Sequence, residues 1–180
     1  VWSTNVDKRL SAGVGADGRL VVVAANDGTV IALDDQGKEA WRATAASEVN
    51  VPPVVGYGVV VVRSSDYRLQ AFDARNGELL WSIRRPGPAL ALKTSIQMDM
   101  IDGMLIAGMP NGRVMAVDLN SGSVQWEGTV AVSKGATDLE RIIDVVGQPL
   151  IRGPLLCAAA YQGRIVCFDV SQGGVPVWSR

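Results

Sequence analysis

Two kinds of side chain in this sequence have the types and spacing to do chemistry: a series of aspartates and a pair of cysteines. The aspartates recur at intervals of 39, 45 and 51 residues, at Asp34, Asp73, Asp118 and Asp169. Carboxylates act as general acids or bases and as ligands of hard metal ions. The chain has no histidine, so the commonest general base and metal ligand is missing. A carboxylate that returns at each repeat is typical of a structural device and not of one active site.

The two cysteines, Cys157 and Cys167, lie ten residues apart. The pattern around them predicts neighbouring antiparallel strands joined by a turn near Gln162-Gly163. A two-residue hairpin there would put Cys167 opposite Ala158 and would leave Cys157 on the other face. We therefore expect two buried free thiols. Two cysteines define no disulfide framework and leave the compartment open.

Charge and hydropathy exclude two classes of partner. Lysine and arginine together number 17 and aspartate and glutamate 18, which gives a formal net charge of −1. This balance offers no basic surface for a nucleic-acid backbone. No apolar run approaches the roughly 20 residues of a membrane helix, and the first residues lack a signal-peptide pattern. We expect a soluble piece, mature or excised from a longer protein.

Each repeated aspartate belongs to a phrase that occurs four times. The copies are VIALDDQGKEAW (residues 30–41), LQAFDARNGELLW (69–81), VMAVDLNSGSVQW (114–126) and IVCFDVSQGGVPVW (165–178). With Trp2 upstream, the tryptophans are spaced by 39, 40, 45 and 52 residues. Periods of this size are typical of propeller blades, solenoids or arrays.

Short β-branched runs broken by glycine, asparagine and aspartate predict strands, and no long helical periodicity is present. The fold class is therefore all-β. In the second copy we expect four strands, at Pro53–Val55, Val59–Arg63, Arg68–Phe72 and Leu79–Ile83. A four-stranded meander cannot cover both of its faces alone, and stacking such meanders around an axis solves this. The sequence therefore predicts a β-propeller.

The repeated residues have a structural interpretation within such blades. The aspartate ends a strand and accepts hydrogen bonds from turn N–H groups, the glycine supplies a positive φ, and the tryptophan lays its indole against the neighbouring blade. The residues concerned are Asp34, Trp41, Asp73, Gly77, Trp81, Asp118, Gly122, Trp126, Asp169 and Trp178.

The pattern Ala-x-Asp-x-x-x-Gly-x-x-x-Trp resembles the tryptophan-docking motif of the PQQ-type, quinoprotein-dehydrogenase-like propellers. Ala71–Trp81 and Ala116–Trp126 match it without gaps; the first copy is one residue short, and the last has Cys167 for alanine and one extra residue. The resemblance implies blades of four strands in an eight-bladed ring. We expect residues 1–180 to form one partial propeller domain of about four blades. The expected blades are 9–42, 43–84, 85–128 and 129–180, after the outer strand of a preceding blade in 1–8.

Two function classes share that fold. Quinoprotein dehydrogenases need a Ca²⁺ site, a catalytic aspartate and, typically, an adjacent Cys-Cys pair over the cofactor. This chain has no Cys-Cys pair, so we expect no cofactor, no bound metal and no enzyme activity. A fragment of a PQQ-dependent quinoprotein dehydrogenase and a generic propeller interaction module remain the alternatives.

Four further segments occur in the order of another family. VWSTNV (1–6), PALALKTS (88–95), NGRVMAV (111–117) and GATDLERIIDVVGQP (135–149) are similar to segments of the BamB family of outer-membrane assembly lipoproteins of Gram-negative bacteria. The resemblance implies a non-enzymatic scaffold of the β-barrel assembly complex at the periplasmic face of the outer membrane. Its lipid anchor would lie outside this chain. The implied partner is the set of POTRA domains of the barrel-forming subunit, and the implied task is to assist the insertion of β-barrel proteins. Unfolded outer-membrane proteins are a second candidate partner.

The family's binding residues correspond here to Leu90, Leu92, Lys93 and Asp144. Lys93 stands where the family commonly has arginine, which keeps the charge but loses the planar fork. Val146 stands where the family has a second aspartate. Taken from the residues alone, Leu90 and Leu92 would alternate toward the core from a first strand, and this alternative stays open.

The longest connection between copies, Trp126 to Gln148, also draws attention because long insertions in repeat proteins often mark the working face. Within it, TDLE (137–140) is a capping-box pattern and predicts a helical turn near Leu139–Ile143. A partial ring would expose strand edges, and such edges favour self-association.

Overall fold

The computed structural model describes residues 1–87, 97–132, 143–161 and 164–180. The chain divides into two compact units. Unit 1 comprises Val1–Arg85 with Leu119–Gly122, and unit 2 comprises Pro86–Asp118 with Ser123–Arg180. Each unit contains two four-stranded antiparallel sheets, in which every strand pairs with the next one along the chain.

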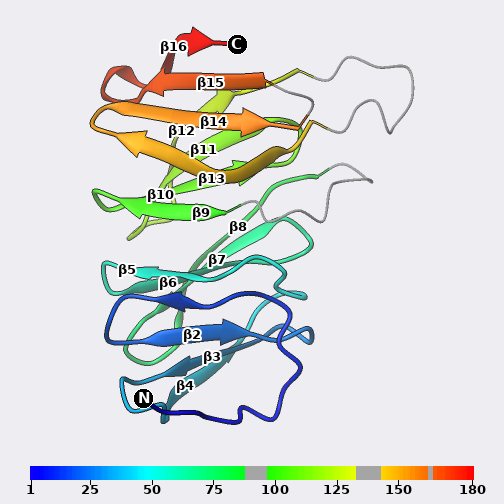
Figure 1. The fold of residues 1–180 in the computed structure, drawn as a ribbon, viewed down its shortest axis with the longest axis vertical. Helices are drawn as coiled ribbons and strands as arrows, with labels where there is room; N and C mark the ends of the chain where they lie inside the picture. Colours follow the sequence, from blue (N-terminus) through cyan, green and yellow to red (C-terminus); the bar gives the residue numbers. More distant parts are fainter. Residues whose placement is uncertain (88–96, 133–142, 162–163) are drawn as a thin grey trace. The chain divides into compact units, whose positions relative to one another are not determined.

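Unit 1 holds the first eight strands (Figure 1). Its sheets are β1 (Gly15–Ala16), β2 (Val21–Ala24), β3 (Thr29–Leu33) and β4 (Glu39–Thr44), then β5 (Val54–Gly56), β6 (Val59–Arg63), β7 (Arg68–Asp73) and β8 (Leu79–Arg84). The middle strands are buried on both faces, as their near-continuous valine and isoleucine runs predict. Val22, Val60 and Phe72 from the two sheets share one core.

Unit 2 holds the other eight strands and one short helix. Its sheets are β9 (Met98–Ile101), β10 (Met104–Met109), β11 (Arg113–Asp118) and β12 (Val124–Thr129), then β13 (Val145–Arg152), β14 (Leu155–Ala160), β15 (Arg164–Asp169) and β16 (Val175–Ser179), with the 3₁₀ helix η1 (Val170–Gln172) before β16. Ile106, Leu156 and Phe168 belong to a core that both sheets share. In Figure 1 the β9–β10 and β13–β14 turns lie at the same end of this unit.

These sheets confirm the prediction of an all-β chain made of four-stranded blades. In the second copy, the expected strands agree with the observed ones to within one residue at each end. Within the described ranges, η1 is the one helix, and none of these residues forms a helix long and apolar enough to cross a membrane. The helical turn expected near 139–143 lies outside the described residues except for Ile143, which is buried.

A bulge recurs at the same place in all four sheets, between the third and fourth strands. It follows Ala32, Ala71, Ala116 and Cys167. Each of these residues lies directly opposite the tryptophan of its own copy, as Ala71 does opposite Trp81. A bulge bends a strand and re-aims its side chains, and in each sheet it lies beside the same register position of the tryptophan.

The expectations for the two cysteines were wrong. Cys157 lies directly opposite Cys167 and the two form a disulfide, with their Cα atoms 3.9 Å apart. The strands do neighbour each other, but Ala160 pairs with Arg164, so three residues and not two separate the paired positions. This odd loop length shifts the register by one residue and brings both sulfurs to the same face. Both cysteines are half-buried, not buried.

Candidate functional site

The repeated aspartates use their carboxylates inside their own turns. Asp34 Oδ1 accepts hydrogen bonds from the backbone N–H groups of Gln36 and Lys38, both at 2.9 Å. Asp169 Oδ1 accepts from the N–H of Ser171 at 3.0 Å and from its hydroxyl at 2.6 Å. The bonds from backbone N–H groups are local side-chain-to-backbone bonds that close turns, and the bond from the Ser171 hydroxyl joins two side chains of the same turn.

Asp73 adds an ion pair to the same kind of turn. Its Oδ1 accepts from the backbone N–H of Arg75 at 2.8 Å, and its Oδ2 lies 2.6 Å from an Arg75 guanidinium nitrogen. The Arg75 side chain, followed by the Arg75 backbone N–H, lowers the pKa of Asp73 to about 2. Both contacts favour the charged carboxylate, so at neutral pH Asp73 is a fixed anion with a structural partner.

The tryptophans connect one copy to the next through the indole N–H. Trp41 Nε1 donates to the carbonyl oxygen of Ala74 at 2.8 Å, and Trp81 Nε1 donates to that of Leu119 at 2.7 Å. Trp2 Nε1 donates to the carbonyl of Asp35 at 2.8 Å. Each acceptor residue directly follows a repeated aspartate.

The repeated glycines make room for these indoles. A Cβ atom added at Gly77 would lie 2.6 Å from Trp41 Cε3, and one at Gly122 would lie 2.8 Å from Trp81 Cδ2. Both glycines also have φ above +70°. Glycine is therefore required at these positions for two reasons: the backbone has a positive φ, and a Cβ atom would collide with the indole.

Of the predicted binding residues, Leu90, Leu92 and Lys93 lie outside the described residues. Asp144 is described and is buried, with 1% of its surface exposed. Its Oδ1 accepts a hydrogen bond from the backbone N–H of Asn111 at 3.2 Å, and its carbonyl accepts from the N–H of Tyr161 at 2.9 Å. Its position links the β10–β11 and β14–β15 turns, and a direct role in binding stays a prediction.

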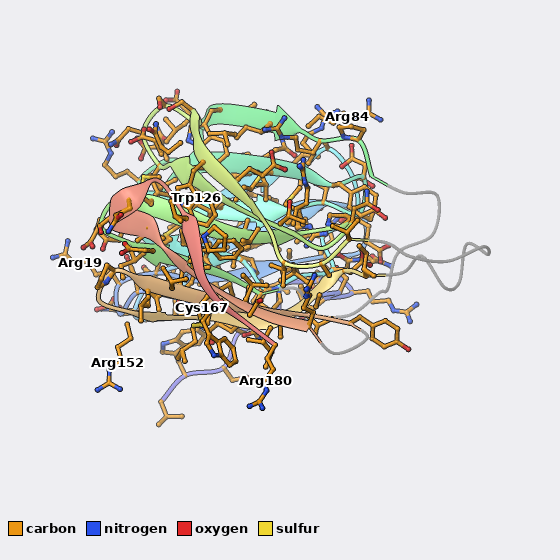
Figure 2. The ribbon with its side chains drawn as sticks, turned by 90° about the horizontal axis from the view of Figure 1, so that it is seen from above. Arg19, Arg84, Trp126, Arg152, Cys167 and Arg180 are labelled. Carbon is orange, nitrogen blue, oxygen red and sulfur yellow. A yellow bond between two sulfur atoms is a disulfide. The ribbon has the colours of Figure 1, made fainter. Side chains whose placement is uncertain are left out.

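Two features of unit 2 escaped the sequence analysis. One is the disulfide, for which the loop length was the missing signal. The other is a hollow of about 430 Å³ beside Trp126 and Met104, which single-strand patterns do not reveal. Trp126 and Cys167 are labelled in Figure 2. Among the described residues, no group of three or more histidine, cysteine, aspartate or glutamate side chains is placed to hold a metal ion.

Comparison with known proteins identifies relatives along the full chain. Residues 1–180 match the family model described as outer membrane protein assembly factor BamB. The BamB of Bordetella pertussis is 60% identical over 180 residues, which are 100% of this chain and 47% of that protein. The BamB of Burkholderia pseudomallei is 41% identical over 181 residues, again 100% of this chain and 47% of the relative. The chain thus spans about half the length of these curated relatives.

Solved structures agree with the sequence relatives. The crystal structure of BamB from Moraxella catarrhalis matches with a TM-score of 0.93 at 25% identity, over 99% of this chain and 55% of that one. A europium-containing methanol dehydrogenase matches with a TM-score of 0.70 at 15% identity, over 93% of this chain and 41% of that one, which is a likeness of fold alone. Since the family model covers every residue, the chain belongs to the family of outer membrane protein assembly factor BamB.

Proposed function

We propose that this chain is part of a non-enzymatic scaffold for outer-membrane protein assembly. In this proposal it contributes about four blades to a larger ring, binds the POTRA domains of the barrel-forming subunit and assists the insertion of β-barrel proteins. The observation that carries the proposal is the match of residues 1–180 to the BamB family model, with a relative 60% identical over the whole chain.

The chemistry of the repeated aspartates is consistent with a scaffold. The carboxylates of Asp34, Asp73 and Asp169 accept hydrogen bonds within their own turns. A carboxylate held by its own turn stabilises the fold and is not presented to a substrate. These three aspartates therefore have a structural task.

The disulfide supports a location at the periplasmic face of the outer membrane. Cys157 and Cys167 are bonded across β14 and β15 and are half-buried. Disulfides form and persist in oxidising compartments, of which the bacterial periplasm is one, and are rare in the cytosol. A lipid anchor on the intact protein is part of the same proposal.

For the binding surface we propose a division of tasks. Leu90, Leu92 and Lys93 would contact the POTRA domains, since two leucines beside a charge have the composition of a small hot spot. Asp144 would act indirectly, because its carboxylate is buried and holds the backbone of Asn111. Replacing Asp144 would then weaken binding through a displaced turn.

The test is calorimetric titration of the intact protein with the POTRA domains. We expect Leu90→Ala with Leu92→Ala to weaken binding by about 1–3 kcal/mol. The matched control is Leu79→Ala with Leu80→Ala on β8, whose leucines are 53% and 45% exposed. The control should bind like the wild type. Unchanged binding by the first variant, or an equal loss in the control, would refute the proposed surface.

A further inference from the structure

All five methionines of the chain belong to one sheet of unit 2. They lie on β9, β10 and β11, at Met98, Met100, Met104, Met109 and Met115. Oxidants convert the thioether of methionine to a sulfoxide, which is polar where the thioether was apolar. The two cysteines are bonded to each other, so no free thiol competes for an oxidant. This sheet therefore holds the sulfur atoms of the chain that peroxides oxidise readily.

The strand register places one methionine apart from the other four. Met104 stands two residues before Ile106 on β10, so the two side chains share a face of the sheet. Ile106 belongs to the core between the two sheets of unit 2, and Met104 packs against that core. The opposite face contains Leu105 and Ala107. The methionines that pair or alternate with these residues share it: Met98, Met100, Met109 and Met115.

Burial divides the methionines in a second way. Met98, Met109 and Met115 are 3%, 4% and 0% exposed, whereas Met100 and Met104 are half-buried. Oxidation requires contact between the sulfur atom and the oxidant, so exposure of the side chain governs its rate. Met100 and Met104 are therefore the candidates for oxidation in the folded chain, and the other three are protected.

A hollow gives an oxidant room beside Met104. Its volume is about 430 Å³, and Met104 lines it together with Trp126 and Leu156. A water molecule takes up about 30 Å³ in the liquid, and hydrogen peroxide is little larger, so the hollow has space for the oxidant and for the added oxygen atom. Met100 lines a second hollow of about 330 Å³. Access therefore does not distinguish Met104 from Met100.

The surroundings of the two sulfur atoms do distinguish them. Met104 packs against the core that contains Ile106, Leu156 and Phe168, whereas Met100 is not among the residues packed against that core. A polar oxygen placed among apolar side chains costs free energy unless a donor bonds it. Oxidation of Met104 therefore weakens the packing between the two sheets, and oxidation of Met100 leaves that core unchanged.

We propose that Met104 is an oxidation site through which hydrogen peroxide and related peroxides destabilise unit 2. The sulfur lone pair attacks one oxygen of the peroxide and the O–O bond breaks. The departing hydroxide takes the proton of the transferred O–H group and leaves as water. The thioether is thereby oxidised to a sulfoxide and the peroxide is reduced. Methionine sulfoxide reductases reverse this step with electrons from thiols.

The first test treats the folded 180-residue chain with hydrogen peroxide and measures the sulfoxide at each methionine by fragment-ion mass spectrometry. We expect Met100 and Met104 to oxidise at least about 10-fold faster than the three buried methionines. In urea all five should react alike, which controls for differences in detection. Equal rates in the folded chain, or protection of Met104, would overturn the proposal.

Two leucine variants separate access from consequence. Leucine keeps the apolar volume of methionine and has no sulfur, so Met104→Leu and Met100→Leu should both fold. Peroxide should lower the urea midpoint, followed by circular dichroism, of the wild type and of Met100→Leu. It should leave the midpoint of Met104→Leu unchanged. If treated Met104→Leu loses as much as the treated wild type, Met104 is not the site that matters.

If Met104→Leu does not fold, graded oxidation of Met100→Leu decides. Met104 is then the one half-buried methionine that remains, and the urea midpoint should fall in proportion to its sulfoxide fraction. A midpoint that stays constant while the sulfoxide of Met104 accumulates would refute the proposal. Because no partner protein takes part, either outcome leaves the proposed function untouched.

Discussion

The contact between a tryptophan and a glycine of the next copy is the smallest unit that organises this chain. It combines an indole N–H bonded to a backbone carbonyl with a glycine that leaves space for the ring. Gly77 illustrates both demands, since its φ is +74° and a Cβ there would lie 2.6 Å from Trp41. The positive φ was predictable from the turn sequence, but the approach of the indole required the structure.

We therefore predict that Gly77→Ala destabilises unit 1 by about 2–4 kcal/mol, which adds the cost of a left-handed residue to that of overpacking. Gly58→Ala is the control, because Gly58 has φ +76° and nothing lies within 4 Å of an added Cβ. It should cost only about 1–2 kcal/mol. Urea denaturation of the two variants measures the difference, and equal losses would show that the indole is not in the way.

The Asp73–Arg75 pair makes a prediction about pH. The pKa of Asp73 is lowered from 3.8 to about 2 by the Arg75 side chain and backbone N–H. A depressed folded-state pKa gives stability that is present above the unfolded-state value of about 4 and is lost as the pH falls through about 2. We expect Arg75→Ala to lower the denaturation midpoint at neutral pH and to make stability fall less steeply between about pH 4 and pH 2.

The check is a series of urea midpoints across that pH range for Arg75→Ala and the wild type. Arg19→Ala is a comparison on the exposed surface, where the guanidinium makes no ion pair within the described residues. If the urea midpoint of Arg75→Ala depends on pH in the same way as that of the wild type, the ion pair does not have the proposed effect on stability.

At the scale of the elements, strands and their order followed from the β-branched runs and turn residues, whereas the register of one hairpin did not. Strands β5 to β8 lie within one residue of their predicted bounds. The β14–β15 hairpin was assigned a two-residue loop, and the observed three-residue loop moved Cys157 opposite Cys167. Because side chains alternate with a period of two, an error of one residue reverses a face, and sequence alone did not fix the loop length.

The disulfide predicts a difference between oxidised and reduced chains. Closing a loop between Cys157 and Cys167 lowers the entropy of the unfolded chain, which corresponds to about 2–3 kcal/mol for a loop of this size. We expect Cys157→Ser with Cys167→Ser, or treatment with a thiol reductant, to destabilise unit 2 by that amount. Thiol titration of the unfolded, unreduced chain should find no free thiol; two free thiols would contradict the bond.

At the scale of the whole chain, the regular sequence repeat made the fold predictable, whereas the candidate sites do not follow from the repeat. The period, the aspartates and the tryptophans indicated the blades. The hollow beside Trp126 is lined by residues from two sheets of unit 2, so it depends on packing between strands that are distant in sequence. Asp144 corresponds by resemblance to a binding residue, but its side chain is buried, because burial depends on neighbours distant in sequence such as Asn111.

The tryptophans along the chain should consequently differ in what they contribute to stability. Trp81 is 8% exposed and donates to Leu119, Trp126 is half-buried without that bond, and Trp178 is 47% exposed. Changing Trp81 to phenylalanine removes a buried hydrogen bond and ring volume and should cost about 2–4 kcal/mol. The same change at Trp178 should stay within about 0.5 kcal/mol.

Trp126→Phe should fall between these two values, because only packing on Phe168 and the hollow is altered. Urea denaturation of the three variants of the 180-residue chain, followed by circular dichroism, gives the order. If Trp126→Phe were as costly as Trp81→Phe, the indole N–H of Trp126 would have an acceptor within the folded chain. If all three variants lose the same free energy of unfolding, the contacts of each tryptophan with the following copy do not determine its contribution to stability.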